Sequence, residues 1–426
     1  MTENSKISRI FHGDKAIWVV FFFLCIISLV EVFSSASTLA YKSGSFWQPL
    51  FKQALFLGIG TLVVLAVHNI PCRKFKIIPF FFLPAAIFLL LFALCFGGSV
   101  NGASRWVSFF GLSFQPSEIA KGALITTVAL VLAVLQREKG TERVAFKYIM
   151  WLTGVVCVLI VMENLSTAAL LGGVVFLMMI IGRVPTDLLL KLFGVVVLFV
   201  LSALLLVKVL PDDTSHKVYD LPGLHRLSTW KNRLDTHSDR DKQISPAEYD
   251  IDKNAQIAHA RIAIASSRGI GKAPGNSVER DFLSQAFSDF IFAIIIEELG
   301  LLGAAFVLLL YLTLLFRAGR IASRCERNFP AFLIMGLALL FVAQALINMM
   351  VAVGLFPVTG QPLPLISRGG TSTLINCAYI GMMLSVSRYA AEAEQARKQQ
   401  AEQEAEEKAL LAPEDEAEYR SSEGLV

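Results

Sequence analysis

Residues 286–316 read AFSDFIFAIIIEELGLLGAAFVLLLYLTLLF, an almost unbroken apolar stretch whose charged residues are Asp289, Glu297 and Glu298. A helix needs about 20 apolar residues to cross the hydrocarbon core of a bilayer, so this stretch is long enough to span a membrane. The whole chain has the same character, because 55% of its 426 residues are hydrophobic and 17% are charged. This composition excludes a soluble enzyme, and equally one held by a single membrane anchor.

Nine further apolar stretches complete the pattern and predict an all-α polytopic membrane protein of about ten transmembrane helices. The predicted spans cover 16–33, 50–70, 75–96, 118–136, 148–162, 165–182, 188–210, 286–316, 329–352 and 371–389. Basic residues gather in cytoplasmic loops of membrane proteins. With both termini in the cytoplasm, seventeen basic residues fall in inner segments and four in the short outer segments, which are Lys42, Lys52, Arg105 and Arg368.

The predicted topology divides the chain into three parts. Residues 1–15 form a cytoplasmic N-terminal segment, 16–389 the membrane domain, and 390–426 an acidic cytoplasmic tail, expected to be a solvated helix or disordered. A large periplasmic loop, about 211–285, joins the seventh and eighth spans and contains a helix-like run over 255–267. The first span could instead be a cleavable signal peptide, but its length and the charge pattern favour a retained helix.

Charged residues inside a membrane span are candidate functional positions, because one at a helix centre costs roughly 2.5–3.5 kcal/mol on insertion scales. Glu118 and Lys121 lie three apart on one helix face, so they form either a structural ion pair or part of a site. Asp289 opens the eighth span on its outer side. It is either a helix cap, a proton acceptor at a wet cavity, or both.

The connection between the ninth and tenth spans reads FPVTGQPLPLISRGGTS over 356–372. Its proline and glycine content between two apolar helices predicts a re-entrant segment, which is tolerated at membrane depth where protein or water surrounds it. Gly369 and Gly370 precede a helix start, where exposed N–H groups favour anions. The alternative is a tight turn with Arg368 at the headgroup level.

Taken together, several stretches resemble the SEDS family of polytopic peptidoglycan polymerases, and its cell-division branch more than its elongation branch. They are NGASRW (101–106), FQPSEIAK (114–121), ENLSTA (163–168), GIGKAPGNS (269–277), SQAFSDFIFAIIIEELGLLG (284–303) and NMMVAVGLFPVTGQPLPLISRGGTS (348–372). The resemblance covers about residues 10–390. It implies an inner-membrane glycosyltransferase that polymerises lipid II into glycan strands at the division septum, with its active site on the periplasmic side.

The resemblance also implies partners and site residues. The partners are lipid II, the nascent glycan strand, a class B penicillin-binding transpeptidase, other division membrane proteins and membrane lipid, with no nucleic acid. Asp289 is the expected catalytic residue. The expected substrate-binding residues are Arg105, Trp106, Glu118, Lys121, Lys272, Ser288, Ser367, Arg368, Gly369 and Gly370. We expect no metal-ligating residues and no bound cofactor; a Mg²⁺ or Mn²⁺ ion would arrive with the substrate pyrophosphate.

A mechanism follows from these residues and the chemistry of glycan transfer. An α-linked donor yields a β-1,4 bond by direct displacement with inversion, which needs a base for the acceptor hydroxyl and positive groups for the departing pyrophosphate. We assign Asp289 as the base and Arg105, Lys121 and either Arg368 or Lys272 to the pyrophosphate, with Glu118 orienting Lys121. Trp106 could bind a sugar face, although the aromatic belt of the membrane interface explains it equally well.

The sequence departs from the family pattern at three places. Glu163-Asn164 stands where the family usually has Asp, Phe287 where it has His, and Arg368 where it has Tyr.

Two other function classes fit part of the pattern. A lipid flippase or transporter would use the Glu118–Lys121 pair and the broken segment, and lipid flipping without polymerisation would identify it. A non-catalytic division scaffold would use the helix surfaces and the tail, but leaves the buried ionisable groups unexplained.

Overall fold

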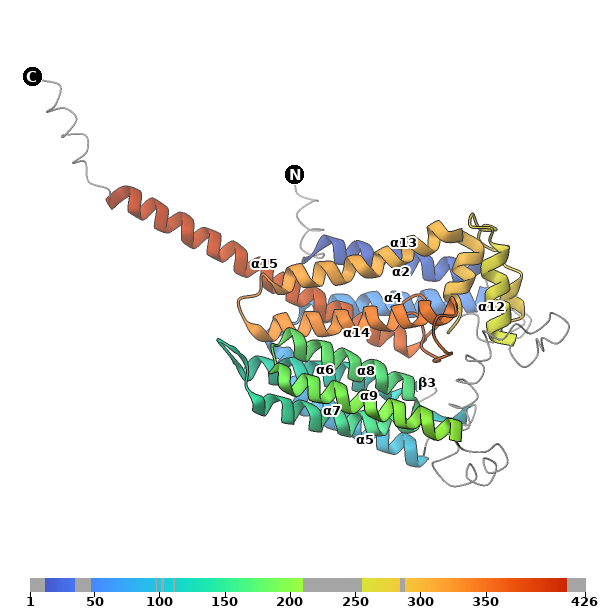
Figure 1. Cartoon of the computed structure of the whole chain (residues 1–426). Coiled ribbons are helices and arrows are strands. Elements are labelled where there is room, and N and C mark those ends of the chain that lie inside the picture. The colour runs from blue at the N-terminus through green and yellow to red at the C-terminus, as the bar shows by residue number, and fades with distance from the viewer. Residues whose placement is uncertain are drawn as a thin grey trace, which may run out of the picture.

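The computed structural model describes residues 12–34, 47–96, 98–100, 103–109, 112–209, 255–283 and 288–411, and between 98 and 113 it gives the backbone only. Each predicted span coincides with a helix (Figure 1). The helices are α2 (Lys15–Ser34), α4 (Trp47–Asn69), α5 (Ile78–Phe96) preceded by the 3-10 turn η1 (Cys72–Ile77), α6 (Pro116–Val134), α7 (Arg143–Glu163), α8 (Leu165–Ile181), α9 (Thr186–Val209), α13 (Ile291–Ala322), α14 (Asn328–Ala352) and α15 (Thr371–Leu411).

Seven of these helical segments are long and apolar enough to cross a membrane, and α8 is an apolar helix of 17 residues. The prediction of a polytopic helical membrane protein is therefore confirmed. Apolar side chains on the outside of the bundle, such as Phe80 (70% exposed) and Phe81 (68%), suit contact with lipid tails.

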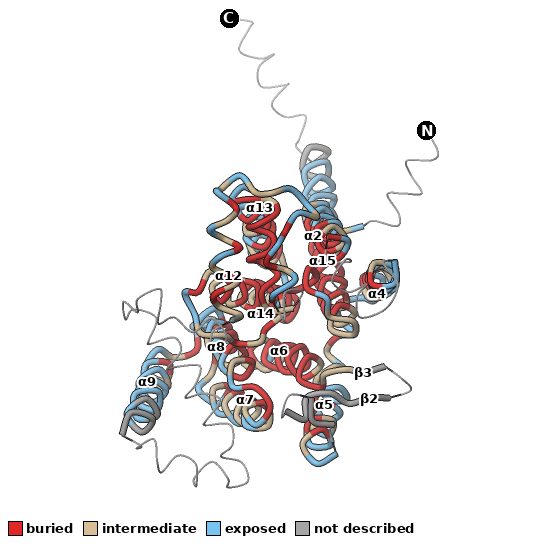
Figure 2. Tube along the Cα trace, turned by 90° about the vertical axis from the view of Figure 1, so that its right-hand side faces the viewer, coloured by how far each residue is buried: buried red, intermediate tan, exposed pale blue. Residues whose placement is uncertain are grey.

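The helix α14 lies at the centre of the bundle and packs against α6, α8, α13 and α15. Buried residues concentrate on α6, α13 and α14, whereas α9 and the outer faces of α4, α5 and α7 are exposed (Figure 2). A helix buried on all sides can place polar groups against neighbours on several faces, since each must find a partner away from water. For this reason α14 is the helix best placed to organise a site.

Two small sheets interrupt the helical pattern, and the sequence analysis did not predict them. Strands β1 (Gly98–Val100), β2 (Ala103–Phe109) and β3 (Leu112–Phe114) form an antiparallel sheet between α5 and α6. Strands β4 (Gln136–Arg137) and β5 (Gly140–Thr141) pair as a hairpin between α6 and α7. The sequence of β2, ASRWVSF, does not alternate polar and apolar residues as a half-buried strand does, so no such pattern marks the first sheet.

The long outer loop is described in its C-terminal part. There, α12 (Ala255–Ser266) packs against α13 and is followed by the 3-10 turn η3 (Glu279–Asp281). The helix-like run predicted over 255–267 thus forms a helix. At the opposite end of the bundle α15 continues beyond the other helices (Figure 1), so part of the predicted tail is helical as far as Leu411. Residues 211–254, 412–426 and Phe287 lie outside the described residues.

Candidate active site

Asp289 lies two residues before α13 and is fixed to α14 through its backbone. Its carbonyl oxygen accepts a hydrogen bond from Asn348 Nδ2 at 2.9 Å, and its carboxylate accepts one from Ser288 Oγ at 2.8 Å. The N-cap residue of α13 is Phe290, which makes no side-chain cap hydrogen bond. Asp289 therefore precedes the cap position. Its backbone is held in place while the residue as a whole stays only half-buried.

The segment before α15 runs through the interior, as a re-entrant segment should, and its residues from Leu363 to Ser367 are buried. Four of its backbone carbonyls accept hydrogen bonds from side chains of the surrounding helices. The pairs are Gln361 with Asn348 at 2.8 Å, Pro362 with Gln344 at 3.0 Å, Pro364 with Tyr311 at 2.6 Å, and Ile366 with Ser28 at 2.9 Å. These side chains replace the hydrogen bonds that a helix would supply, which is how irregular backbone is tolerated at this depth.

Ser367 joins the re-entrant segment to the turn that carries Asp289. Its hydroxyl donates to the backbone carbonyl of Ser288 at 2.6 Å and accepts from the backbone N–H of Leu363 at 2.8 Å. Leu365 adopts a positive φ of 65°, which is unfavourable for a branched side chain. The carbonyls of Pro364 and Ile366, on either side of Leu365, accept hydrogen bonds from Tyr311 and Ser28, and these bonds hold the conformation. The structure thus brings together three of the predicted residues, Ser288, Asp289 and Ser367.

The predicted pair of Glu118 and Lys121 lies inside the bundle. Lys121 Nζ is 2.8 Å from Glu118 Oε1 and donates to Gln344 Oε1 at 2.7 Å. Both charged residues are almost fully buried, with 1% of Lys121 and 3% of Glu118 exposed. Gln344 in turn donates to the carbonyl of Pro362. Lys121 therefore connects α6 to the re-entrant segment through α14, and this geometry favours a positioning role for Lys121.

Lys272, predicted to lie near the pyrophosphate, pairs with a carboxylate in the middle of the first part of α13. Its Nζ is 2.6 Å from Glu297 Oε1, and Glu297 also accepts from Ser277 Oγ at 2.5 Å and from the backbone N–H of Val278 at 3.2 Å. The Glu297 side chain is fully buried, whereas 29% of the Lys272 side chain is exposed. The outer loop is thereby attached to the helix that follows Asp289.

A break in α13 lets the outer loop approach this closely. Gly300 has a φ of 69° inside the helix, and Lys272 N–H donates to the carbonyl of Glu297 at 2.9 Å. Gly271 has a φ of 91°, and a Cβ atom there would lie 2.5 Å from both Glu298 O and Gly300 N. Only glycine fits this position, because both the backbone conformation and the space exclude a side chain.

A second carboxylate of α13 joins the end of α2 to the outer loop. Glu298 accepts a short hydrogen bond from Ser34 Oγ, and its Oε1 lies 3.8 Å from Arg280 Nη1. Arg280 also donates to Ser34 Oγ at 3.0 Å. Two neighbouring glutamates, Glu297 and Glu298, thus bind different parts of the same loop, so the loop is anchored at two points.

Asn164, one of the departures from the family pattern, is the N-cap of α8. Its side chain accepts hydrogen bonds from the backbone N–H groups of Ser166 at 3.0 Å and Thr167 at 3.4 Å. Asparagine is as good an N-cap as aspartate, so the change keeps the helix start. Thr167 Oγ1 accepts from Gln361 Nε2 at 2.5 Å, which connects α8 to the re-entrant segment.

The remaining predicted residues lie on either side of this cluster. Arg105 and Trp106 are in β2, where Trp106 is opposite Gly98 of β1; their side chains lie outside the described part of the chain. Arg368 is exposed. Gly370 has a φ of 51°, and Gly369 accepts from the backbone N–H of Ser372 at 3.0 Å, so the two glycines form the turn into α15.

The uncharged residues that hold the site together are not among those predicted from the sequence. Gln344 and Asn348 lie four apart on the apolar helix α14, and therefore on one face. That spacing of two amides within an apolar helix is the sequence signal for these residues. No group of three or more His, Cys, Asp or Glu side chains that could bind a metal occurs among the residues the structure describes.

Residues 14–392 match the family model described as "Cell cycle protein", which is named for FtsW, RodA and SpoVE. A protein of Geobacter metallireducens named "Probable peptidoglycan glycosyltransferase FtsW" is 30% identical over 402 residues, which cover 91% of this chain and 98% of that protein. The protein of the same name from Legionella pneumophila is 32% identical, over 88% of this chain and 90% of its own.

Two solved structures have the same fold. One, from a study of the structural coordination of polymerization and crosslinking by a peptidoglycan synthase complex, superposes with a TM-score of 0.64 and 24% identity, covering 89% of this chain and 98% of the other. The second is the rod shape determining protein RodA of Thermus thermophilus, with a TM-score of 0.59 and 22% identity over 88% and 97% of the two chains.

Proposed function

The chain belongs to the cell cycle protein family of FtsW, RodA and SpoVE, and from that premise we propose that it is a peptidoglycan glycosyltransferase that polymerises lipid II. In the proposed reaction, a sugar hydroxyl of one substrate attacks the anomeric carbon of the other. The new β-1,4 glycosidic bond forms as the bond to the polyprenyl pyrophosphate breaks, with inversion. The hydroxyl proton passes to a base, and the pyrophosphate leaves with the electron pair.

The observation that supports Asp289 as the base is its half-buried position on an anchored backbone. A general base must come within hydrogen-bond reach of the hydroxyl it deprotonates. The carboxylates deeper in the bundle are 3% exposed or less and are enclosed by protein; they are Glu31, Glu118, Glu163, Glu297 and Glu298. Asp289, by contrast, is open enough to be approached, and Asn348 fixes the backbone from which its carboxylate projects.

The pyrophosphate would be bound by the more accessible cations. Arg368 is exposed, and Lys272 is partly exposed while paired with Glu297. Arg105, whose side chain lies outside the described part of the chain, is the third candidate on the basis of the sequence. Lys121, which is 1% exposed, would act instead through Gln344 on the re-entrant segment. A Mg²⁺ or Mn²⁺ ion accompanying the substrate would neutralise part of the pyrophosphate charge. Ser288 would orient the Asp289 carboxylate through its hydrogen bond.

The same proposal extends to partners and location. We place the site on the periplasmic side of the inner membrane, on the basis of the basic residues in the loops at the other end of the bundle. The similar fold in a peptidoglycan synthase complex supports a crosslinking partner, for which we propose a class B penicillin-binding transpeptidase. The family supports a role at the division septum together with other division membrane proteins.

The proposal is tested by polymerising lipid II with the purified full-length protein and separating the glycan strands by gel electrophoresis. Asp289→Asn keeps the size of the side chain and one oxygen that can accept from Ser288 Oγ but removes the base, so strand formation should fall by about 10²-fold or more. Asp281→Asn, at an exposed carboxylate of η3, is the matched control and should retain activity. Near-normal polymerisation by a correctly folded Asp289→Asn protein would exclude Asp289 as the base.

A further inference from the structure

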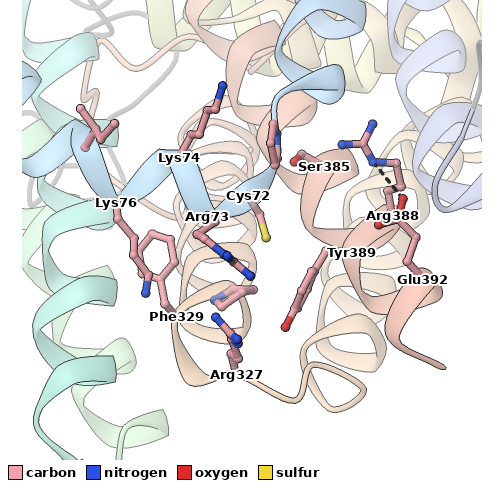
Figure 3. A pocket seen from close by; sticks show the side chains of 13 residues that line it. Cys72, Arg73, Lys74, Lys76, Arg327, Phe329, Ser385, Arg388, Tyr389 and Glu392 are labelled. Atoms are coloured by element: carbon pink, nitrogen blue, oxygen red, sulfur yellow. Dashed lines mark ion pairs between the residues drawn. The ribbon is translucent and has the colours of Figure 1, made fainter. Parts of the chain in front are cut away.

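A pocket of about 490 Å³ lies at the end of the bundle opposite α12, between η1, the start of α14 and the middle of α15 (Figure 3). Its lining is strongly basic. Five cationic side chains and one acidic one contribute to it, namely Arg73, Lys74, Lys76, Arg327, Arg388 and Glu392. In Figure 3, Arg73 from η1 and Arg327 from the start of α14 point toward one another across the pocket.

The positive charge of the pocket is mostly uncompensated. Arg388 pairs with Glu392 at 3.5 Å. Within the residues that the structure describes, no carboxylate forms an ion pair with Arg73, Lys74, Lys76 or Arg327. Lys76 Nζ instead lies 5.6 Å from the centre of the Phe329 ring. Charges of one sign in a concave site focus the field and attract a counter-ion, so this pocket favours an anionic ligand.

An apolar, lipid-facing surface adjoins the basic lining. Ile77 lines the pocket and is 52% exposed. Phe80 and Phe81, three and four residues further on, are 70% and 68% exposed; this spacing places them on the same side of the helix as Ile77. Exposed aromatic and aliphatic side chains in a membrane domain contact acyl chains. A ligand of this pocket would therefore meet cations at one end and lipid at the other.

We propose that the pocket binds the phosphate headgroup of an anionic glycerophospholipid whose acyl chains lie along the start of α5. The location fits, because η1 lies between α4 and α5 and Arg327 directly precedes α14, so these cations lie at helix ends and not at a helix centre. Basic pockets between transmembrane helices are suited to phosphate headgroups. Binding would link three elements distant in sequence, where Arg388 already donates to the carbonyl of Asn69 at 3.4 Å and Ser385 to that of Ile70 at 2.5 Å.

The test is native mass spectrometry of the purified full-length protein titrated with cardiolipin, phosphatidylglycerol and phosphatidylcholine. The pocket variant carries Arg73→Gln, Lys74→Gln and Arg327→Gln. The control variant loses the same charge at exposed residues of the same end of the bundle, with Lys139→Gln, Lys147→Gln and Lys191→Gln. We expect the pocket variant to bind cardiolipin at least about tenfold more weakly than the wild type and the control less than about twofold more weakly. The wild type and both variants should bind phosphatidylcholine only weakly.

Four outcomes would overturn the proposal. The first is no loss of binding in the pocket variant, and the second is an equal loss in both variants, which would indicate only general electrostatic attraction. The third is full displacement of cardiolipin by excess inorganic phosphate, which would indicate a site for a soluble anion. The fourth is binding of phosphatidylcholine as tight as that of cardiolipin, which would show that the pocket does not recognise the anionic charge of the headgroup.

Single variants keep the test decisive if the triple pocket variant does not fold. Arg73→Gln and Arg327→Gln change exposed residues and should each weaken cardiolipin binding about threefold. Unchanged binding in both, in proteins that elute as the wild type does, would overturn the proposal. The measurement is a binding constant, so it is independent of whether the protein polymerises lipid II.

Discussion

Asn348 and Asp289, 59 residues apart in the chain, are joined by a hydrogen bond of 2.9 Å from the Asn348 side-chain amide to the Asp289 backbone carbonyl. The same amide donates to the carbonyl of Gln361 at 2.8 Å. One side chain of the central helix α14 therefore fixes both the turn that carries the proposed base and the start of the re-entrant segment. The position of the carboxylate depends on a residue that has no chemical role itself.

Asn348→Ala should lower both stability and polymerisation. It removes two hydrogen bonds and leaves two enclosed carbonyls without this donor, which should reduce the free energy of unfolding by about 1–3 kcal/mol. Denaturant unfolding and strand formation from lipid II would measure the two effects. Thr126→Val is the matched control, since Thr126 is buried and donates to the carbonyl of Gly122 in its own helix at 2.8 Å. Equal polymerisation by the two variants would contradict the positioning role of Asn348.

Gly271→Ala should destabilise the protein more than Gly275→Ala. Both glycines have a φ near 90°, so both substitutions force alanine into a left-handed backbone at a penalty of about 1 kcal/mol. At Gly271 the added Cβ would also lie 2.5 Å from α13 backbone atoms, whereas at Gly275 nothing lies within 4 Å. Thermal unfolding of both variants would measure the difference. Equal shifts would show that the outer loop is not held against the break in α13.

The Glu118–Lys121 pair should respond differently to one substitution and to two. Lys121→Met leaves the Glu118 carboxylate, 3% exposed, without its cation and should destabilise the protein by about 3–5 kcal/mol. Adding Glu118→Gln should restore most of that loss.

The activity of the double variant decides between the two roles of Lys121. If Lys121 positions Gln344, to which it donates at 2.7 Å, polymerisation should stay low in the stable double variant. Recovery of full activity would show that the pair serves only as a structural ion pair. Lipid II polymerisation, measured beside unfolding on the same preparations, distinguishes the outcomes.

The Lys272–Glu297 ion pair should show a larger coupling energy than an exposed ion pair with the same N–O distance. Its N–O distance is 2.6 Å with a fully buried Glu297 side chain. The Arg137–Glu142 pair also measures 2.6 Å, but 69% and 35% of its side chains are exposed. Double-mutant cycles with Lys272→Met and Glu297→Gln, and with Arg137→Met and Glu142→Gln, should give about 1–2 kcal/mol for the first pair and below about 0.5 kcal/mol for the second. Similar coupling energies for the two pairs would contradict the inference that Glu297 anchors the outer loop.

The membrane-spanning helices follow from the amino-acid sequence alone. Stretches such as 286–316 must form helices in a bilayer, because only a helix satisfies its backbone hydrogen bonds within one segment. The ends of the apolar runs likewise predicted a break between residues 162 and 165, and in the structure Asn164 caps α8 there. The proline-rich stretch before Ser367 could be predicted as re-entrant, because proline residues interrupt a helix.

The surroundings of each polar side chain, by contrast, depend on how the helices pack together. The spacing of Glu118 and Lys121 predicts that they meet, but burial of the pair and its contact with Gln344 depend on how α6 packs against α14. Likewise, the reason for glycine at 271 becomes visible only where α13 breaks beside it. Hydropathy indicates how long a helix is and whether it prefers lipid. The hydrogen bond between Asn348 and Asp289, which are 59 positions apart, forms only when α14 lies beside the turn that precedes α13.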